Sequence, residues 1–589
     1  MRILGLVTLS HDTGVALLDN GEIVSVLEEE RHTREKHTIW FPRQSLAALF
    51  GPDGRGLAGI DVVTTPWDEQ RLRRTFASAV FKGLPASLNL IRDSAHTAQD
   101  GAVVIMKTLL RFGLKRYFPR QRLPQIVCVG HHESHAAMFF VLPFEDATVI
   151  VMDGFGDDAS SSIFTGVGNR LERQWHGAFF DSLGMIYTLI TRHLGYEVFE
   201  EGTVMALAAL GTNRLVDKMR DIVRLEHDGS FKINMSYFDY DRYGMIRPFR
   251  PKFIDTFGPA RQRGEPLGDR HKDIAFALQA VAEDVILHVA KSARARYPSK
   301  NLVFVGGVAL NCVANARLVR ESGFERIWVP PCASDTGAPL GSALYHHHQT
   351  LDQPRRCVLT HAYHGLATSD AEIEAALTAG GFRFERLGDA ALIAKTARDL
   401  ADGKIVGWFQ GRYEIGPRAL GNRSILASPI TPGVRDKINA RVKFREPFRP
   451  FAPSVLAERA SEYFEIEQPD PFMTLAPRVR PEMAARIPAA VHVDGTSRIQ
   501  TVEKSANPRY HALIHAFGVL TGVPILLNTS FNKQEPVVAR PEEAISCYLR
   551  TDIDVLVLGN YYTTDRPEAA VAKAQASFEV IEVNTRGGE

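Results

Sequence analysis

A repeated pattern of short strands and acidic loops constrains the fold of this chain more than any other feature. Residues 2–6 have the composition of a buried strand, and a polar loop, a strand at 15–19, an Asn-Gly turn and a strand at 23–27 follow. The same order returns later, with strands at 148–152, 161–165 and 171–177 and a Gly/Asp-rich loop at 153–158. Two copies of this pattern predict an α/β fold with two similar lobes that face a cleft. Chance recurrence of hairpins is the alternative.

A change in composition near residue 350 predicts a second domain. With 589 residues, the chain is too long for one compact core. We expect a first domain at 1–350, a linker at 351–368, a second domain at 369–566 and a polar, partly disordered tail at 567–589. The histidine triplet 346–348 could hold a metal, but on a polar linker we expect it to be solvated.

Charge and cysteine content exclude several functions. Lys and Arg number 69 against 68 Asp and Glu, so the net charge is +1, which argues against a protein that coats nucleic acid or an anionic membrane. The five cysteines are widely spaced and form no CxxC pair, so a reducing cytoplasm fits best. Apolar stretches such as 302–310 and 523–527 are far shorter than the roughly 18 residues that span a bilayer. We therefore expect a cytoplasmic protein without nucleic-acid or membrane partners.

Candidate metal ligands lie near the loops of the repeat. His131 and His135 are four residues apart, so on a helix both imidazoles lie on one face and can share one ion. Asp153 and Asp335 occupy strand-to-loop positions that could converge on the same cleft. Two imidazoles and two carboxylates suit iron, manganese or zinc. Histidines at this spacing are nevertheless more often capping or surface residues.

Loops after strands provide further candidate positions. Gly306 and Gly307 follow an apolar strand, and Gly154 lies in an acidic loop; such glycines let backbone N–H groups approach a phosphate, although most are structural. His11 and Asp12 follow the first strand. A histidine placed over a cleft can take the proton of an attacking hydroxyl. The alternative is a loop pair without chemistry.

The second domain concentrates cations and small polar residues in three segments. Arg418 and Arg423 lie in GPRALGNRS (416–424), and KFREPFRPF (443–451) interleaves three cations with aromatic residues. The third segment, NTSFN (528–532), follows a buried strand. Arginine forks and a lysine point charge are what a phosphate-rich substrate requires. Single-stranded RNA binding is the alternative, which the near-zero net charge disfavours.

Together, these segments resemble the O-carbamoyltransferase family of antibiotic and nodulation-factor biosynthesis, which includes the cephalosporin and tobramycin carbamoyltransferases. The resemblance implies an actin/Hsp70-like duplicated domain of the tRNA threonylcarbamoyltransferase type, followed by a YrdC-like α/β domain. The stretches that carry it cover nearly the whole chain in one order: SHDTGVAL (10–17), EEERHTREKH (28–37), HHESHAA (131–137), MDGFGDD (152–158), EEGTVMALAALG (200–211), GGVALN (306–311), SDTGAPLGSA (334–343), GPRALGNRSIL (416–426), KFREPFRPFAPSV (443–455) and LNTSFN (527–532).

The resemblance implies that the second domain makes a carbamoyl adenylate from carbamoyl phosphate and ATP, with Mg²⁺. The family's KxR…SxN signature is matched by the segments at 443–445 and 530–532. Lys443 and Arg418 are the implied catalytic residues. The residues implied to bind phosphates or the nucleotide are Arg423, Arg445, Arg449, Arg498, Asn528, Ser530 and Asn532.

In the first domain, the resemblance implies a transfer site with an iron-like divalent metal. His11 or Asp12 would activate the acceptor hydroxyl, and the adenylate would contact glycines and polar residues. The implied metal ligands are His131, His135, Asp153 and Asp335. The implied adenylate-site residues are Lys36, Gly154, Glu201, Gly306, Gly307 and Asn311. For Glu201, the alternative is a helix N-terminal carboxylate without a ligand.

The implied acceptor is a small hydroxylated natural product, for example an aminoglycoside antibiotic. We expect loops within 40–120 and 230–270 to bind it, and a homodimer is left open. A fused tRNA threonylcarbamoylation enzyme is a second interpretation, but it predicts a basic surface that the charge balance does not favour. A third is a sensor with an actin-like ATPase lobe, which leaves the cation-rich second domain unexplained.

Overall fold

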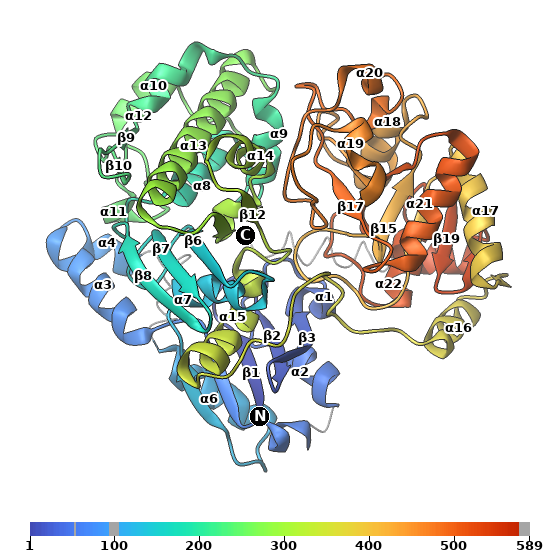
Figure 1. The fold of residues 1–589 in the computed structure, drawn as a ribbon, viewed down its shortest axis with the longest axis horizontal. Coiled ribbons are helices and arrows are strands. Elements are labelled where there is room, and N and C mark those ends of the chain that lie inside the picture. The colour runs from blue at the N-terminus through green and yellow to red at the C-terminus, as the bar shows by residue number, and fades with distance from the viewer. Residues whose placement is uncertain (52–54, 93–104, 577–589) are drawn as a thin grey trace. The chain divides into compact units, whose positions relative to one another are not determined.

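The computed structural model describes residues 1–51, 55–92 and 105–576. The chain divides into two compact units, unit 1 (Met1–Leu359) and unit 2 (Thr360–Glu589) (Figure 1). Residues 352–369, which include most of the predicted linker, carry no helix or strand, and the division falls within them. Of the predicted polar tail, residues 568–576 are helical and 577–589 lie outside the described residues.

The first sheet of unit 1 is built from the first copy of the predicted repeat. The strand order is β3-β2-β1-β4-β5. The first three strands are antiparallel to one another, whereas β4 and β5 continue the sheet in parallel from β1. The strands are β1 (Arg2–Val7), β2 (Gly14–Asp19), β3 (Glu22–Glu28), β4 (Val62–Thr65) and β5 (Gln125–Cys128).

The second sheet repeats this topology. Its order is β12-β11-β6-β7-β8, again with three antiparallel strands and two that extend the sheet in parallel. The match confirms the predicted duplication and the actin-like class of unit 1. The strands are β6 (Asp146–Met152), β7 (Ser161–Val167), β8 (Arg170–His176), β11 (Asn301–Val305) and β12 (Arg326–Trp328), and a separate hairpin pairs β9 (Val223–Leu225) with β10 (Phe231–Ile233).

Helices of unit 1 pack against these sheets because the central strands are buried throughout and need cover on both faces. The long α13 carries an apolar stripe, from Ile274 to Val289, on its buried side. Helix α15 lies so close to β1 that a Cβ at Gly5 would overlap the carbonyl of Pro339. The helices are α1 (Glu29–Thr33), α2 (Arg43–Phe50), α3 (Glu69–Lys82), α4 (Leu88–Arg92), α6 (Met106–Tyr117), α7 (His131–Ala136), α8 (Leu183–His193), α9 (Glu201–Ala208), α10 (Val216–Arg220), α11 (Tyr240–Tyr243), α12 (Pro251–Phe257), α13 (Asp269–Arg296), α14 (Cys312–Glu321) and α15 (Ala338–Leu344).

The histidine triplet is buried, so the prediction that it is solvated is wrong. Helix α15 continues as a π-helical turn, Tyr345–Thr350, which places all three imidazoles in the interior of unit 1. His347 lies directly under the β2–β3 turn, where a Cβ at Gly21 would be 2.7 Å from its Nε2 atom. Burial lowers the pKa of His347 to about 4, so this imidazole is neutral and fills space in the core.

Unit 2 is an α/β domain around an eight-stranded sheet, in agreement with the YrdC-like class that the resemblance implied. The order is β13-β20-β19-β14-β15-β18-β16-β17. The strands are β13 (Glu385–Arg386), β14 (Val406–Phe409), β15 (Arg423–Ala427), β16 (Ala452–Leu456), β17 (Gln500–Val502), β18 (Ile525–Ser530), β19 (Val555–Leu558) and β20 (Tyr561–Thr563).

Alternating side chains of this sheet form two cores. One core packs against α17 and α21, and the larger one packs against α16, α18, α19 and α22. The helices of unit 2 are α16 (Asp370–Ala379), α17 (Asp389–Ala401), α18 (Val434–Ile438), α19 (Ala460–Tyr463), α20 (Pro481–Ala484), α21 (Pro508–Thr521) and α22 (Pro541–Leu549). Within the described parts of both units, no helix combines the length and the apolar content that crossing a bilayer would require.

Strand register brings the predicted phosphate-binding segments of unit 2 to one end of the sheet. The last residue of β14 pairs with the first residue of β15, and the second residue of β15 pairs with the last residue of β18. Strands β16 and β17 both begin at this same end of the sheet. The register pairs are Phe409 with Arg423, Ser424 with Ser530, Ala452 with Asn528, and Ser454 with Gln500. Loops that are far apart in the sequence therefore meet at a single edge.

Candidate active sites

The four predicted metal ligands of unit 1 converge on one point. His131 and His135 lie on α7, Asp153 follows β6, and Asp335 precedes α15, and all four are buried or nearly so. Their ligand atoms all lie within 4.8 Å of one another. The Nε2 atom of His135 is 2.9 Å from Asp153 Oδ2 and 3.3 Å from Asp335 Oδ1. Sequence spacing alone favoured a surface role for the two histidines, but the fold buries them beside two carboxylates.

Neighbouring groups orient these side chains as metal ligands. The Nδ1–H of His131 can donate to the carbonyl of Pro66 at 3.2 Å, which leaves Nε2 with a lone pair directed at the cluster. Trp67 stacks on this imidazole with ring centroids 4.1 Å apart. Asp157, which the sequence analysis missed, accepts the backbone N–H of His131 at 2.6 Å and fixes the start of α7.

The residues of the cluster fit a divalent cation. Asp153 Oδ1 accepts N–H groups from Gly154 and Gly307, whereas the buried Oδ2 faces the Nε2 atoms of His131 and His135 at 3.5 and 2.9 Å. Burial opposes charge on every member, yet the carboxylates raise the pKa of His131 well above its usual value. The charges of the imidazoles in turn hold the pKa of Asp335 well below its usual range. The carboxylates therefore create a potential that demands positive charge, and imidazole and carboxylate donors suit iron, manganese or zinc.

Beside this cluster, Asp12 connects two histidines. Its Oδ2 atom lies 3.1 Å from Nδ1 of His11, and its Oδ1 atom lies 2.7 Å from Nδ1 of His37. Nε2 of His11 lies 3.7 Å from Oδ2 of Asp335. Burial lowers the pKa of His11, but the charges of Asp335 and Asp12 outweigh this effect and raise it to about 10. Both oxygens of Asp12 are engaged, so this residue is an orienting carboxylate.

Several residues expected at the adenylate site have structural roles. Gly306 has φ 92°, and a Cβ there would overlap the carbonyl of Met152, so glycine lets β11 and β6 end close together. Asn311 caps α14 through Ala314 N–H at 3.1 Å. Glu201 is the first residue of α9 and accepts from Thr188 at 2.6 Å, which fits the alternative of a helix N-terminal carboxylate. Lys36 is exposed beside His37.

In unit 2, three residues of the signature lie together, Lys443, Ser530 and Asn532. The ammonium of Lys443, which is buried, donates to the carbonyl and hydroxyl of Ser530 at 2.6 and 3.1 Å. It also donates to the carbonyl and side-chain oxygen of Asn532 at 3.0 and 2.6 Å. A positive charge is thus held rigidly at the end of β18.

Three arginines gather at the same end of the sheet. Burial and the charges of Arg449 and Arg498 lower the pKa of Arg445 to about 9, and the opposing charge of Glu446 is a smaller effect. The buried Nε atom of Arg498 has no hydrogen-bond partner among the described residues. A guanidinium stays charged at neutral pH, so the lowered pKa measures a free-energy penalty that a bound anion would relieve.

Two other predicted ligand residues act inside the fold. The buried guanidinium of Arg423 donates to backbone carbonyls, including those of Gln410 and Gly411, and lies 3.6 Å over the ring of Phe409. Asn528 donates to the carbonyl of Ala419 at 3.1 Å. These contacts shape the 410–423 loop, and they leave little of either side chain for a ligand. Arg418, within that loop, is half-buried.

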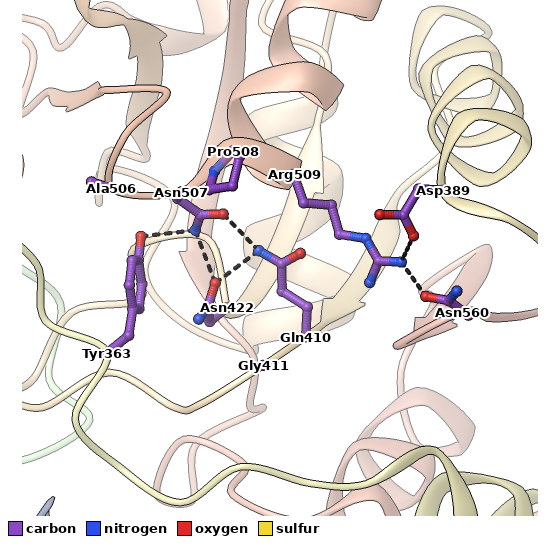
Figure 2. A pocket seen from close by; sticks show the side chains of 10 residues that line it. All are labelled: Tyr363, Asp389, Gln410, Gly411, Asn422, Ala506, Asn507, Pro508, Arg509 and Asn560. Carbon is purple, nitrogen blue, oxygen red and sulfur yellow. Dashed lines mark hydrogen bonds and ion pairs between the residues drawn. The ribbon is translucent and has the colours of Figure 1, made fainter. Parts of the chain in front are cut away.

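A polar pocket of about 450 Å³ opens at this end of the sheet, and the sequence analysis missed it (Figure 2). The carboxamide of Gln410 donates to the side-chain oxygens of Asn422 and Asn507 at 2.8 and 2.9 Å. Asn507, the N-cap of α21, donates to the hydroxyl of Tyr363 at 2.9 Å. On the opposite wall, Arg509 contacts Asp389 and Asn560. Lone carboxamides in loops carry no sequence signal by which the pocket could have been found.

Sequence comparison identifies the class of protein to which these sites belong. Residues 2–344 match the carbamoyltransferase N-terminus, and residues 397–565 match the carbamoyltransferase C-terminus. The chain therefore belongs to the carbamoyltransferase family. It is an enzyme that transfers a carbamoyl group, as the motifs predicted.

Three relatives illustrate the range of this similarity. An uncharacterized protein of Synechocystis is 38% identical, over 95% of this chain and 96% of its own length. The nodulation protein NolNO of Sinorhizobium fredii is 37% identical, over 95% of this chain and 80% of its own length. The 3'-hydroxymethylcephem-O-carbamoyltransferase of Amycolatopsis lactamdurans is 34% identical, over 50% of this chain and 55% of its own length.

Proposed function

We propose that this chain is an ATP-dependent O-carbamoyltransferase that works in two steps, one in each unit. The observation that carries the proposal is the group of cations around Lys443 in unit 2. A transferase that used carbamoyl phosphate directly would need one phosphate site beside its acceptor. Here, a cluster of one lysine and three arginines suits a polyphosphate and belongs to a different unit from the metal-ligand cluster.

The first step in unit 2 produces carbamoyl adenylate. Water splits carbamoyl phosphate into carbamate and inorganic phosphate. A carbamate oxygen then attacks the α-phosphorus of ATP, and pyrophosphate leaves with the electron pair of the broken P–O bond. The adenylate is a useful product because carbamate is a poor electrophile until it carries a good leaving group.

Each part of unit 2 then has a role. Arg445, Arg449 and Arg498 hold phosphate groups, whose negative charge would offset the mutual repulsion of the guanidinium groups. Lys443 stabilises the charge that develops on the transferring phosphate, and Mg²⁺ accompanies ATP. The pocket of Figure 2 takes the nucleoside, because carboxamides and a phenol can hydrogen-bond a base and a ribose without requiring charge.

The second step, in unit 1, passes the carbamoyl group to an alcohol. His131, His135, Asp153 and Asp335 hold an iron-like divalent ion, which supplies Lewis-acid polarisation of the carbamoyl oxygen when bound. An imidazole oriented by Asp12 takes the proton of the alcohol. AMP leaves, and the loop at Gly154, where a Cβ would meet no atom within 4 Å, leaves space for its phosphate.

The acceptor is a small hydroxylated natural product. Support comes from the cephem relative, whose name places a hydroxymethyl group at its reacting position, and from the nodulation relatives. Part of the 40–120 segment, in which we expected acceptor contacts, lies outside the described residues. We keep the acceptor as a class, an alcohol on a small molecule.

Pyrophosphate release tests the proposal. Purified protein is incubated with carbamoyl phosphate and ATP without an acceptor, and each substrate is omitted in turn as a control. Pyrophosphate that requires both substrates supports adenylate formation. Pyrophosphate at background in the complete mixture would sink the proposal, and ATP hydrolysis to ADP that ignores carbamoyl phosphate would favour the ATPase-sensor interpretation.

A further inference from the structure

The inference concerns a basic surface of unit 1 that lies outside both candidate sites. Residues 105–125, which contain α6 and the residues that lead into β5, include six cations and neither aspartate nor glutamate. All six are exposed, and within the described part of the chain none forms an ion pair: Lys107, Arg111, Lys115, Arg116, Arg120 and Arg122. The near balance of 69 cations and 68 acidic residues over the whole chain conceals this local excess.

The packing of α6 fixes which of its faces points outward. Four residues at helical spacing form its buried side: Met106, Leu110, Gly113 and Leu114. A Cβ at Gly113 would lie 2.4 Å from the ring of Phe41, so the helix backbone and this ring are in close contact. Phe41 in turn stacks on Tyr117, with ring centroids 5.1 Å apart. These contacts hold α6 in one orientation, in which Lys107, Arg111 and Lys115 form a stripe at i, i+4 spacing on the exposed side.

Two large aromatic side chains lie beside these charges. Phe112, on α6, is 65% exposed, and Trp40, which directly precedes Phe41, is 62% exposed. Arg43, also exposed, lies 5.4 Å over the ring of Tyr117 and extends the basic character to α2. Single exposed apolar residues are common, but two rings this exposed beside a cluster of unpaired cations form a composite surface. Both rings would gain free energy by leaving water.

The surface of an anionic bilayer supplies what both kinds of side chain lack. Lipid phosphates pair with Lys and Arg, and the layer between the headgroups and the acyl chains takes up aromatic rings. A nucleic-acid duplex offers phosphates but no apolar layer for the two rings. An acidic protein would need a carboxylate fixed opposite each of six long side chains, whereas lipids diffuse in the bilayer to meet them.

We propose that the surface formed by α6, residues 118–122 and Trp40 binds peripherally to an anionic lipid bilayer. This surface is separate from the two candidate sites, so its binding does not depend on the proposed function. Helix α6 stays packed on unit 1 through its buried side, its cations contact lipid phosphates, and the rings of Phe112 and Trp40 enter the interfacial layer. The expectation of no membrane partner came from the total charge, which does not describe this surface.

Vesicle binding by the full chain tests the proposal. Sedimentation measures the partition coefficient on vesicles of phosphatidylcholine alone and of phosphatidylcholine mixed with phosphatidylglycerol, at physiological ionic strength. One variant combines Lys107→Gln, Arg111→Gln and Lys115→Gln. The matched control removes three exposed cations that form no ion pair within the described residues, through Lys218→Gln, Lys291→Gln and Arg320→Gln. The control residues lie on α10, α13 and α14, in the part of unit 1 away from α6 (Figure 1).

We expect wild-type protein to bind the mixed vesicles at least about 100-fold more tightly than phosphatidylcholine alone. The α6 variant should lose about 100-fold of that binding, because each cation near an anionic surface contributes about fivefold. The control should lose only a few-fold, and Phe112→Ser should weaken binding several-fold without any change of charge. Equal losses in the two triple variants, or equal binding of wild-type protein to both kinds of vesicle, would overturn the proposal. Tighter binding to double-stranded RNA or to polyglutamate than to the mixed vesicles would overturn it in favour of a nucleic acid or an acidic protein.

A second measurement locates the contact on the molecule. Phosphatidylcholine brominated near the top of its acyl chains quenches the fluorescence of tryptophans that reach the interfacial layer, and Trp40 is one of five tryptophans in the chain. We expect quenching of wild-type protein on mixed vesicles that contain this lipid, and its loss in Trp40→Phe. Quenching that persists unchanged in Trp40→Phe, or bound wild-type protein that is not quenched, would place the contact on another face and overturn the assignment.

Discussion

Replacement of Arg498 by methionine should make unit 2 more stable and at the same time abolish its response to phosphate ligands. Methionine keeps most of the aliphatic volume but removes the charge and the buried Nε–H that has no partner. An arginine that served the fold would behave in the opposite way, because its loss would cost stability. The substitution therefore separates a binding role from a structural one.

The magnitude follows from the neighbouring arginine. The pKa of Arg445 is about 9 instead of 12.5, which at 1.36 kcal/mol per unit is a penalty of about 5 kcal/mol. Burial is the largest cause, so we assign to the charge of Arg498 about 1 kcal/mol of it. An unsatisfied buried donor costs about 1–3 kcal/mol more, and part of this returns when methionine fills the site. We expect a net gain in the free energy of unfolding of about 1–2 kcal/mol.

Differential scanning calorimetry with and without ATP measures both effects. For a domain of this size, about 1–2 kcal/mol corresponds to an increase in Tm of about 2–8 °C. In wild-type protein, ATP at 100 times its Kd should add about 2.7 kcal/mol, and this ligand effect should disappear in Arg498→Met. Arg398→Met, on the exposed face of α17, is the matched control and should change neither quantity.

Two outcomes would refute the reasoning. If Arg498→Met unfolds at a lower temperature and still responds to ATP, the arginine supports the fold. If the variant is more stable but its ATP response is unchanged, the three arginines are crowded for a reason other than phosphate binding.

Three further predictions follow from the described contacts. Asp153→Asn should weaken the binding of one Co²⁺ per chain by about 100-fold or more, because even changes to outer-shell partners cost about 10–100-fold. Titration followed by visible absorption measures this binding, and tight binding in the variant would exclude this site. Burial would raise the pKa of Glu535, but Arg550 at 2.8 Å and N–H donors lower it from 4.5 to about 2, so the carboxylate stabilises the fold above pH 4.5 and this stabilisation is lost as pH falls toward 2. Glu535→Gln should cost about 3 kcal/mol in urea unfolding at pH 7 and should flatten the decline in the free energy of unfolding between pH 4.5 and 3. A decline parallel to that of wild-type protein would contradict this. Tyr363→Phe removes a hydroxyl that is hydrogen-bonded to the carbonyl of Leu420 and to the side chain of Asn507. The KM for ATP should rise several-fold while the KM for carbamoyl phosphate stays constant. Equal changes in both KM values would show that the pocket does not bind the nucleotide.

Pattern-based reasoning reached the fold because the signals were periodic and repeated. The strand, loop and hairpin order at residues 2–28 recurs at 146–176, and the two sheets indeed share one topology. It failed for the histidine triplet, because polar neighbours suggested a linker whereas α15 continues through it and buries all three imidazoles. Local composition does not reveal where a helix stops when the next turn is π-helical.

The candidate site was predictable in its ligands and less so in their surroundings. His131, His135, Asp153 and Asp335 come together because the segments that follow β5, β6 and β12, strands of the two matching sheets, converge. Asp157 has no signal in the sequence, since its role depends on one backbone N–H. Arg423 looked like a phosphate ligand by type, and only the contacts with backbone carbonyls show that it shapes a loop.

The central claim is that one chain makes carbamoyl adenylate in unit 2 and consumes it in unit 1. Exchange of labelled pyrophosphate into ATP in the presence of carbamoyl phosphate reports the first step alone, because it is the reverse of adenylate formation. We predict exchange in wild-type protein, retention in Asp335→Asn and a loss of at least about 100-fold in Lys443→Met, which lacks the charge held by Ser530 and Asn532. Exchange that survives in Lys443→Met, or that disappears in Asp335→Asn, would contradict the assignment of the two steps to the two units.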